Sequence, residues 1–203
     1  RCASEVQDAL ISILSEKRLS VPELGLEVPA EKGFSVIATA NTRDKGVNEM
    51  SAALKRRFNI VVLPTPSDME TEMEIVRTRV AQLSAGLDLN AKQPDKDTVE
   101  KVVTIFRELR SGATLDGKQK LKGTSGVLST AEAISLLANS MALAGSFGSG
   151  EIDGEDLAAA LQGAVVKDEE KDKVFWKEYL ENVMKKRGSA WLPLYRACRE
   201  LNP

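Results

Sequence analysis

The side chains best suited to chemistry are an asparagine and two arginines, each adjacent to an apolar run. Asn41 follows the β-type run 34–39, and Arg56 and Arg57 end a predicted helix just before a second such run at 59–63. An amide at the carboxyl edge of a parallel sheet lies where open α/β folds bind their ligands. Guanidinium groups in such a position can stabilise the charge that develops on a transferring phosphoryl group. The segment therefore indicates phosphoryl-transfer chemistry.

Each of these residues also has a purely structural interpretation. Asparagine is common in the turn after a strand, because it tolerates the left-handed backbone conformation. Arginines at the end of a helix often do no more than interact with the helix dipole. Taken one at a time the residues leave both interpretations open, whereas their order and spacing together favour the functional one.

The composition of the 203 residues excludes several other kinds of site. No histidine is present, so the chain has no imidazole for a Ser-His-Asp or Cys-His hydrolase or for a histidine-ligated metal. Cys2 and Cys198 are too few for an all-thiolate zinc site, and we expect both to be reduced thiols and no metal to be bound by protein ligands. A formal net charge of −2 argues against a protein that mainly binds nucleic acid. We expect no association with membranes, because no apolar run is long enough to span one.

An α/β segment at the start of the chain has to position Asn41 and the arginines. Helical periodicity predicts a helix that ends near Lys17, and the alternating residues 19–33 predict a short hairpin. The apolar runs 34–39 and 59–63 flank a short helix at about 47–57, and they predict two strands of a buried parallel sheet.

Beyond Pro64-Thr65-Pro66, which marks a domain boundary, the patterns are almost wholly helical. Residues 111–126 are rich in Gly, Lys, Thr and Ser and predict a loop. Helices are predicted at about 67–83, 97–109, 129–145, 154–165, 168–187 and 191–201. The predicted fold class is therefore mainly α with a partial α/β piece.

The motifs around Asn41 and Arg57 resemble those of an AAA+ ATPase, most closely of the MoxR-type branch. The Ala-Thr-Ala-Asn run that ends at Asn41 matches the strand motif of the sensor-1 asparagine. The Arg-Phe pair that begins at Arg57 matches the motif of the arginine finger, with Arg56 as an alternative. Residues 1–10 resemble the stretch directly after the Walker B acids, and residues 66–72 resemble the start of the helical lid.

The resemblance implies a division of the chain into three parts. Residues 1–66 would be the C-terminal part of a P-loop AAA+ core, residues 67–165 an α-helical lid, and residues 166–203 a C-terminal helical extension. It also implies roles in ATP hydrolysis: Asn41 would position the attacking water, and Arg57 would reach into the site of the neighbouring subunit.

Two parts of the family's nucleotide site depart from the expected pattern. The nearest match to the phosphate-binding Gly-x-x-x-x-Gly-Lys-Ser/Thr loop runs from Gly112 to Gln119, follows a helix and lacks the hydroxyl that holds magnesium, so we interpret it as part of a lid loop. Thr130 occupies the sensor-2 position, where the family usually has an arginine, and Lys122 is an alternative to it. We therefore expect the Walker A and Walker B segments, which bind most of the ATP and Mg²⁺, to precede Arg1, and the 203 residues alone to be inactive.

The resemblance implies part of a cytoplasmic, chaperone-like ATPase that remodels or activates client proteins. Such a protein would form a homo-oligomeric ring, with a hexamer expected, and would work with a von Willebrand A-domain protein. The alternative is a non-enzymatic helical interaction module derived from such an ATPase. A nucleic-acid-remodelling ATPase is a third reading, which the slightly acidic composition disfavours.

Overall fold

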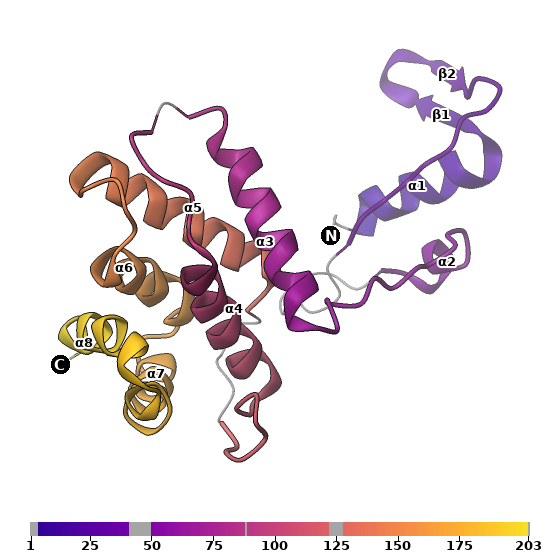
Figure 1. Cartoon of the computed structure of the whole chain (residues 1–203). Coiled ribbons are helices and arrows are strands. Elements are labelled where there is room, and N and C mark those ends of the chain that lie inside the picture. Colours follow the sequence, from indigo (N-terminus) through magenta and orange to yellow (C-terminus); the bar gives the residue numbers. More distant parts are fainter. Residues whose placement is uncertain (1–3, 41–49, 88, 122–127, 203) are drawn as a thin grey trace. The chain divides into compact units, whose positions relative to one another are not determined.

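A computed structural model of the chain describes residues 4–40, 50–87, 89–121 and 128–202. The chain forms two compact units, Arg1–Leu63 and Pro64–Pro203 (Figure 1).

The described residues of the first unit form two α-helices and a β-hairpin. Its elements are α1 (Ser4–Glu16), β1 (Arg18–Val21), the 3₁₀ turn η1 (Pro22–Leu24), β2 (Leu26–Pro29) and α2 (Ala52–Lys55). Lys17 adopts a φ of 56°, so α1 ends there and the chain turns into β1. The two strands pair antiparallel, which confirms the hairpin predicted for residues 19–33.

The runs 34–39 and 59–63, predicted as strands, form no strand within the part of the chain that the structure describes, which corrects that part of the prediction. Within the described residues the one β-ladder is that between β1 and β2. Most of the apolar side chains of both runs are exposed, with Ile37 at 95% and Val62 at 80%, and Val36 is half-buried. A buried parallel strand needs a neighbouring strand for its backbone N–H and C=O groups, and neither run has one in the part of the chain that is described.

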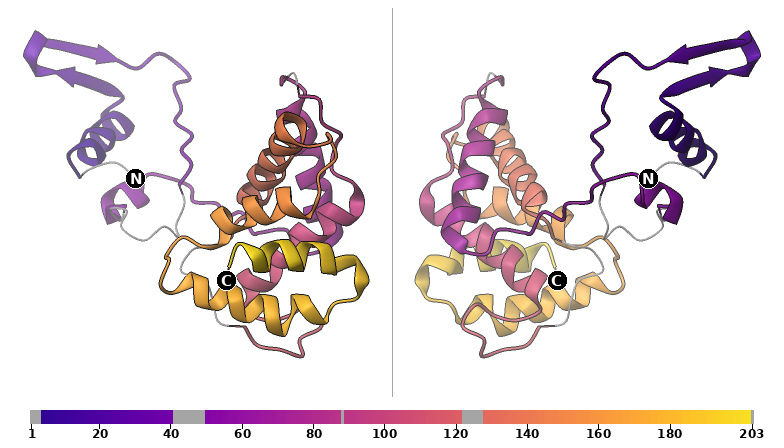
Figure 2. Two further views of the ribbon diagram at one scale, coloured as in Figure 1. Left: turned by 90° about the vertical axis from the view of Figure 1, so that its left-hand side faces the viewer. Right: turned by 90° about the vertical axis from the view of Figure 1, so that its right-hand side faces the viewer.

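The second unit is a helical bundle. Its helices are α3 (Met69–Ser84), α4 (Lys96–Ser111), α5 (Thr130–Phe147), α6 (Gly154–Val165), α7 (Asp172–Asn182) and α8 (Leu192–Glu200), with the 3₁₀ turns η2 (Met184–Lys186) and η3 (Ser189–Trp191). Helix α5 packs against α3, α4 and α6, and α8 packs against α6 and α7 (Figures 1 and 2). One hydrophobic core includes Val80, Phe106, Leu137, Leu161 and Trp176 from five of these helices. The predicted class, mainly α with a partial α/β piece, is confirmed.

Side-chain caps determine where the longer helices begin. Asp68 accepts a hydrogen bond from the N–H of Thr71 at 2.7 Å, which starts α3 and lowers the pKa of the Asp68 carboxyl. Ser129 and Glu132 form a reciprocal capping box at the start of α5, and Asp153 starts α6 in a similar way. None of the described helices is long and apolar enough to cross a membrane.

The helix predicted over 168–187 is shorter in the structure. It begins at Asp172, because the buried carboxylate of Asp172 accepts the N–H groups of Lys167 and Asp168 at 3.0 and 2.9 Å and closes a turn before the helix. After α7 the chain continues as the 3₁₀ turn η2. Side-chain hydrogen bonds to the backbone thus compete with the helix at this end.

Candidate functional site

The residues predicted to act in ATP hydrolysis lie in both units. Asn41, the predicted sensor-1 residue, lies outside the described residues, as does Lys122. Arg56 and Arg57 lie in the first unit, directly after α2, and Thr130 is the first residue of α5 in the second unit. Each is therefore described in its own surroundings.

The guanidinium group of Arg57 is held by two hydrogen bonds within the first unit. Its Nε donates to Oγ of Ser15 at 2.5 Å, and its Nη1 donates to the carbonyl oxygen of Ala53 at 2.8 Å. The second bond satisfies a carbonyl in the last turn of α2, which is the structural role expected of arginine at a helix end. Nη2 has no partner among the described residues, and the side chain is exposed. Arg56, the C-cap residue of α2, is exposed as well.

Helix α1 holds α2 at both ends. Oε1 of Gln7, which is 4% exposed, accepts the N–H of Ser51 at 3.0 Å, and Oγ of Ser51 in turn caps α2 by accepting the N–H of Leu54. Leu54 is the buried residue of α2. Because Gln7 bonds to the residue before α2 and Ser15 bonds to the arginine after its end, the two helices run in the same direction.

Thr130 belongs to a buried ion-pair cluster. Its hydroxyl donates to Oε1 of Glu72 at 2.8 Å, and Glu72 is fully buried. Arg110 donates to both carboxylate oxygens of Glu72, at 3.0 and 2.8 Å, and Arg107 donates to Oε2 at 2.8 Å. Burial raises the pKa of Glu72, but the hydrogen bonds from Arg110, Thr130 and Arg107 outweigh it, so the pKa is lowered and the carboxylate is ionised. We refer to these four residues as the Glu72 cluster.

The Glu72 cluster also fixes the segment that leads into α3. The guanidinium of Arg107 donates to the carbonyl oxygens of Pro66, Ser67 and Asp68, at 3.2, 2.8 and 3.2 Å. Nη1 of Arg110 donates to the carbonyl of Leu128, just before α5. The cluster therefore joins the starts of α3 and α5 to the end of α4.

A second buried carboxylate, Glu108 of α4, joins the lid helices to the C-terminal helices. Its Oε2 accepts the hydroxyl of Tyr179 at 2.7 Å, and its Oε1 accepts the N–H of Leu115 at 2.8 Å and a hydrogen bond from Arg187. Burial and the charge of Glu108 raise the pKa of Tyr179 well above its usual value. Arg187 also lies over the ring of Trp191, 4.5 Å from its centroid. We refer to Glu108 and the residues that bond to it as the Glu108 cluster. The sequence predicted neither cluster, although Glu72 ends the motif over residues 66–72 that resembles the start of the lid.

The glycine-containing segment 112–119 does not form a phosphate cradle. Three of its N–H groups are already used within the segment: Gly117 donates to the carbonyl of Thr114, Lys118 to Oδ1 of Asp116, and Gln119 to Oγ1 of Thr114. A phosphate-binding loop needs such N–H groups free to meet the anion, and the Asp116 carboxylate would repel it. The segment is a turn that follows α4, as its position in the sequence predicts.

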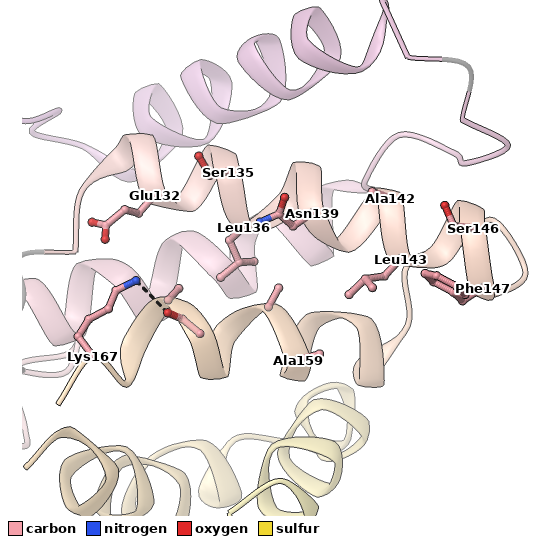
Figure 3. Close-up of a pocket in the computed structure, with 13 residues that line it drawn as sticks. Glu132, Ser135, Leu136, Asn139, Ala142, Leu143, Ser146, Phe147, Ala159 and Lys167 are labelled. Atoms are coloured by element: carbon pink, nitrogen blue, oxygen red, sulfur yellow. Dashed lines mark hydrogen bonds between the residues drawn. The ribbon is translucent and has the colours of Figure 1, made fainter. Parts of the chain in front are cut away.

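An open groove of about 600 Å³ lies between α5 and α6 (Figure 3). Its lining is mostly apolar and small, with Leu143 and Phe147 toward one end. The two charged residues on its lining serve helix ends: Glu132 accepts the N–H of Ser129, and Nζ of Lys167 donates to the carbonyl of Gly163. The groove therefore offers an apolar surface rather than an anion-binding site.

The described residues also contain no cluster of His, Cys, Asp and Glu that could hold a metal ion. Burial raises the pKa of the Cys198 thiol to about 12, so this cysteine is neither a nucleophile nor a thiolate ligand near neutral pH. Among the predicted site residues that the structure describes, Arg57 combines an exposed guanidinium with two anchoring hydrogen bonds.

Comparison with known families agrees with the observed fold class. Residues 70–202 match the family described as the YehL-like AAA+ ATPase C-terminal domain. Residues 1–58 match the AAA domain of the dynein-related subfamily. The chain therefore belongs to the YehL-like AAA+ ATPases. This confirms the resemblance to AAA+ ATPases, and it is consistent with the MoxR-type branch.

Among curated proteins, the chain is similar to the uncharacterized protein YehL of Escherichia coli (strain K12). The two are 36% identical over 206 residues, which cover 99% of this chain and 56% of that protein. The chain thus spans little more than half the length of this relative. No solved structure matches the chain.

Proposed function

We propose that the chain is part of an ATP-hydrolysing AAA+ machine in which Arg57 acts in the ATP site of a neighbouring subunit. The observation that supports this most directly is the anchoring of Arg57 by Ser15 and Ala53. An exposed guanidinium that is held in this way presents a charged, planar group at the surface of a subunit, where it can meet a phosphate held by another.

The proposed roles follow from the positions of the residues in the motifs. ATP with Mg²⁺, when bound, supplies the phosphoryl group and a metal that neutralises part of its charge. Asn41 would orient the attacking water in its own subunit, and Arg57 of the neighbour would stabilise the negative charge that develops. Because the turn over 112–119 uses its own N–H groups, the phosphate-binding loop would belong to a part of the protein outside these 203 residues.

Thr130 has a different role in this proposal. Its hydroxyl already donates to Glu72, so we propose that it holds the start of α5 and does not contact nucleotide through that hydroxyl. The Glu72 cluster would then keep the start of the lid rigid, so that nucleotide binding moves the lid as one body.

For the whole protein we propose a cytoplasmic homo-oligomeric ring of the MoxR type, with a hexamer as the expected assembly. It would use ATP hydrolysis to remodel or activate client proteins, in partnership with a von Willebrand A-domain protein. These proposals rest on the family resemblance.

Mixed rings of the full-length protein test whether Arg57 acts in trans. Arg57→Ala alone and Asn41→Ala alone should each lower ATP turnover, the former by roughly 10³-fold or more. In an Arg57→Ala subunit the site keeps its own Asn41, and an Asn41→Ala neighbour supplies an intact Arg57. An equal mixture should therefore recover up to roughly a quarter of the wild-type rate, the share of head-to-tail interfaces that combine both intact residues.

Arg56→Ala tests the alternative finger, the adjacent exposed arginine, and it should retain most of the activity if Arg57 is the finger. Loss of turnover in Arg56→Ala with turnover retained in Arg57→Ala would assign the finger to Arg56. No recovery in mixed rings, with both single variants inactive and assembled, would contradict action in trans. Undiminished turnover in both single variants would leave the non-enzymatic interaction module as the better account.

A further inference from the structure

A hydrogen bond to the side chain of Ser15 connects Arg57 to α1. Nε of Arg57 donates to Oγ of Ser15 across a separation of 42 residues in the sequence. We infer that Ser15 is a positioning residue for Arg57, one that holds the guanidinium in the plane and direction in which it acts. This inference rests on the proposed function of Arg57, and it adds a residue that the family motifs around Asn41 and Arg57 do not include.

The need for such a residue follows from the shape of arginine. A long, exposed side chain samples many rotamers, and the bond from Nη1 to Ala53 alone would leave the guanidinium free to rotate about that contact. The bond from Nε to Ser15 adds a second anchor on a neighbouring nitrogen of the same planar group. These two hydrogen bonds fix the plane of the guanidinium group. Nη2 has no partner among the described residues, so it is available to a ligand.

The need also follows from the length of α2. Ala52–Lys55 is four residues long, and so short a helix has little stability of its own. Helix α1, with 13 residues, provides the longer framework. Gln7 holds the start of α2 through Ser51, and Ser15 holds the arginine that follows its end. Helix α1 thereby determines both where α2 lies and where Arg57 points.

A set of serine variants in the full-length protein tests the inference. Ser15→Ala removes the acceptor of Nε, whereas Ser15→Thr retains a hydroxyl. Ser12→Ala is the matched control, because Ser12 is another exposed serine of α1. Steady-state ATP turnover should show kcat lowered by roughly three- to tenfold in Ser15→Ala, the loss expected for one hydrogen bond. KM for ATP should stay unchanged, because the finger acts on the transition state.

The same measurements should show that Ser15→Thr recovers most of the lost kcat and that Ser12→Ala matches the wild type. In the Arg57→Ala background, Ser15→Ala should lower turnover no further, because a positioning residue acts only through the residue it positions. Thermal melting should be alike in all these variants, since Ser15 and Ser12 are both exposed.

The outcomes separate this inference from the proposed function. If Arg57→Ala is inactive but Ser15→Ala has the kcat of Ser12→Ala, the role of Ser15 is overturned and that of Arg57 stands. A further loss from Ser15→Ala in the Arg57→Ala background would also overturn it, because the serine would then act elsewhere. If Arg57→Ala retains full turnover, the proposed function and the role of Ser15 fall together.

Discussion

At the scale of single residues, the structural and functional interpretations of a side chain are not exclusive. Nη1 of Arg57 satisfies a carbonyl at the end of α2, which is the structural role that a helix-terminal arginine often has. That bond uses one of the five N–H donors of the guanidinium, so it anchors the side chain and leaves other donors available for a ligand. The hydroxyl of Thr130, in contrast, donates to a buried carboxylate, which removes the donor that a ligand would need.

Two glycines of the second unit should respond to alanine in opposite ways. Gly150 adopts a φ of 84°, and a Cβ there would lie 2.6 Å from the carbonyl oxygen of Asn90. Gly163 lies within α6, where a Cβ would meet nothing within 4 Å. Gly150→Ala should lower the free energy of unfolding by about 1–3 kcal/mol, and Gly163→Ala should raise it by about 0.5–1 kcal/mol. Urea denaturation followed by far-UV circular dichroism measures both; a loss of stability in Gly163→Ala would contradict the open space beside α6.

At the scale of elements, the second unit is organised by two buried carboxylates. Glu72 joins the starts of α3 and α5 to the end of α4, and Glu108 joins α4 to α7 and η2. A buried charge is tolerated only when its partners satisfy it, so each carboxylate requires those helices to keep one arrangement.

Replacement of Glu72 should show how much its cluster contributes. Glu72→Gln leaves Arg107 and Arg110, whose side chains are 18% and 13% exposed, without a counter-charge. Loss of one partner from a buried ion pair typically costs about 3–5 kcal/mol, and we expect the free energy of unfolding to fall by that amount. Glu74→Gln is the control on the exposed face of the same helix, and it should change stability by less than about 0.5 kcal/mol. Equal losses of unfolding free energy in the two variants would show that the ion pairs of the Glu72 cluster contribute no stability beyond the general effect of removing a negative charge.

The Glu72 cluster should also affect how stability depends on pH. The pKa of Glu72 in the folded protein lies below its reference value of 4.5, so the folded state binds this proton less readily than the unfolded state does. Its contribution to stability is therefore fully present above pH 4.5 and is lost as the pH falls through the lower, folded pKa. Urea denaturation at a series of pH values should give a shallower acidic decline for Glu72→Gln than for the wild type. An unchanged slope would mean that other carboxylates determine the decline.

At the scale of the whole molecule, the predicted helical extension 166–203 shares its core with the helices before it. Trp176 and Tyr179 of α7 belong to the same hydrophobic cluster as Phe106 of α4, and α8 packs against α6. The boundary predicted at residue 165 stays a prediction, and a measurement of cooperativity can test it.

Tyr179→Phe tests whether this part of the chain unfolds together with the lid. It removes a donor from the fully buried Glu108, and we expect a loss of about 1–3 kcal/mol. Tyr195→Phe is the control: the hydroxyl of Tyr195 donates to Glu181, whose side chain is 38% exposed, so water can replace it and the loss should be smaller.

Both tryptophans of the chain, Trp176 and Trp191, lie beyond residue 165, so fluorescence reports on the C-terminal helices. Circular dichroism reports on all helices. If the C-terminal helices and the lid form one cooperative unit, Tyr179→Phe should shift both transitions together. A shift in fluorescence alone would show that residues 166–203 unfold as a separate domain.

Much of the helical fold is predictable from the sequence, because helix signals are local. The helix predicted at 154–165 is α6, and that predicted at 129–145 is α5 to within two residues. The strands were less predictable, since a strand depends on a partner that its own sequence does not specify. The hairpin was predictable because β1 and β2 are adjacent in the chain, whereas the apolar runs 34–39 and 59–63 have no partner among the described residues.

The family, the candidate residues Asn41 and Arg57, and the helical nature of the region after Pro66 can all be predicted from the amino-acid sequence alone. These features depend on short motifs and on local periodicity, so they can be recognised without knowledge of three-dimensional contacts. The hydrogen-bond partners of the polar side chains, in contrast, follow only from the three-dimensional packing: Ser15 with Arg57, and Tyr179 with Glu108. Such pairs lie dozens of residues apart, 42 and 71 here, and a serine or glutamate in a helix has the same local pattern whether or not a partner reaches it. Packing of the helices brings the partners together, and burial makes the contacts obligatory where water is excluded.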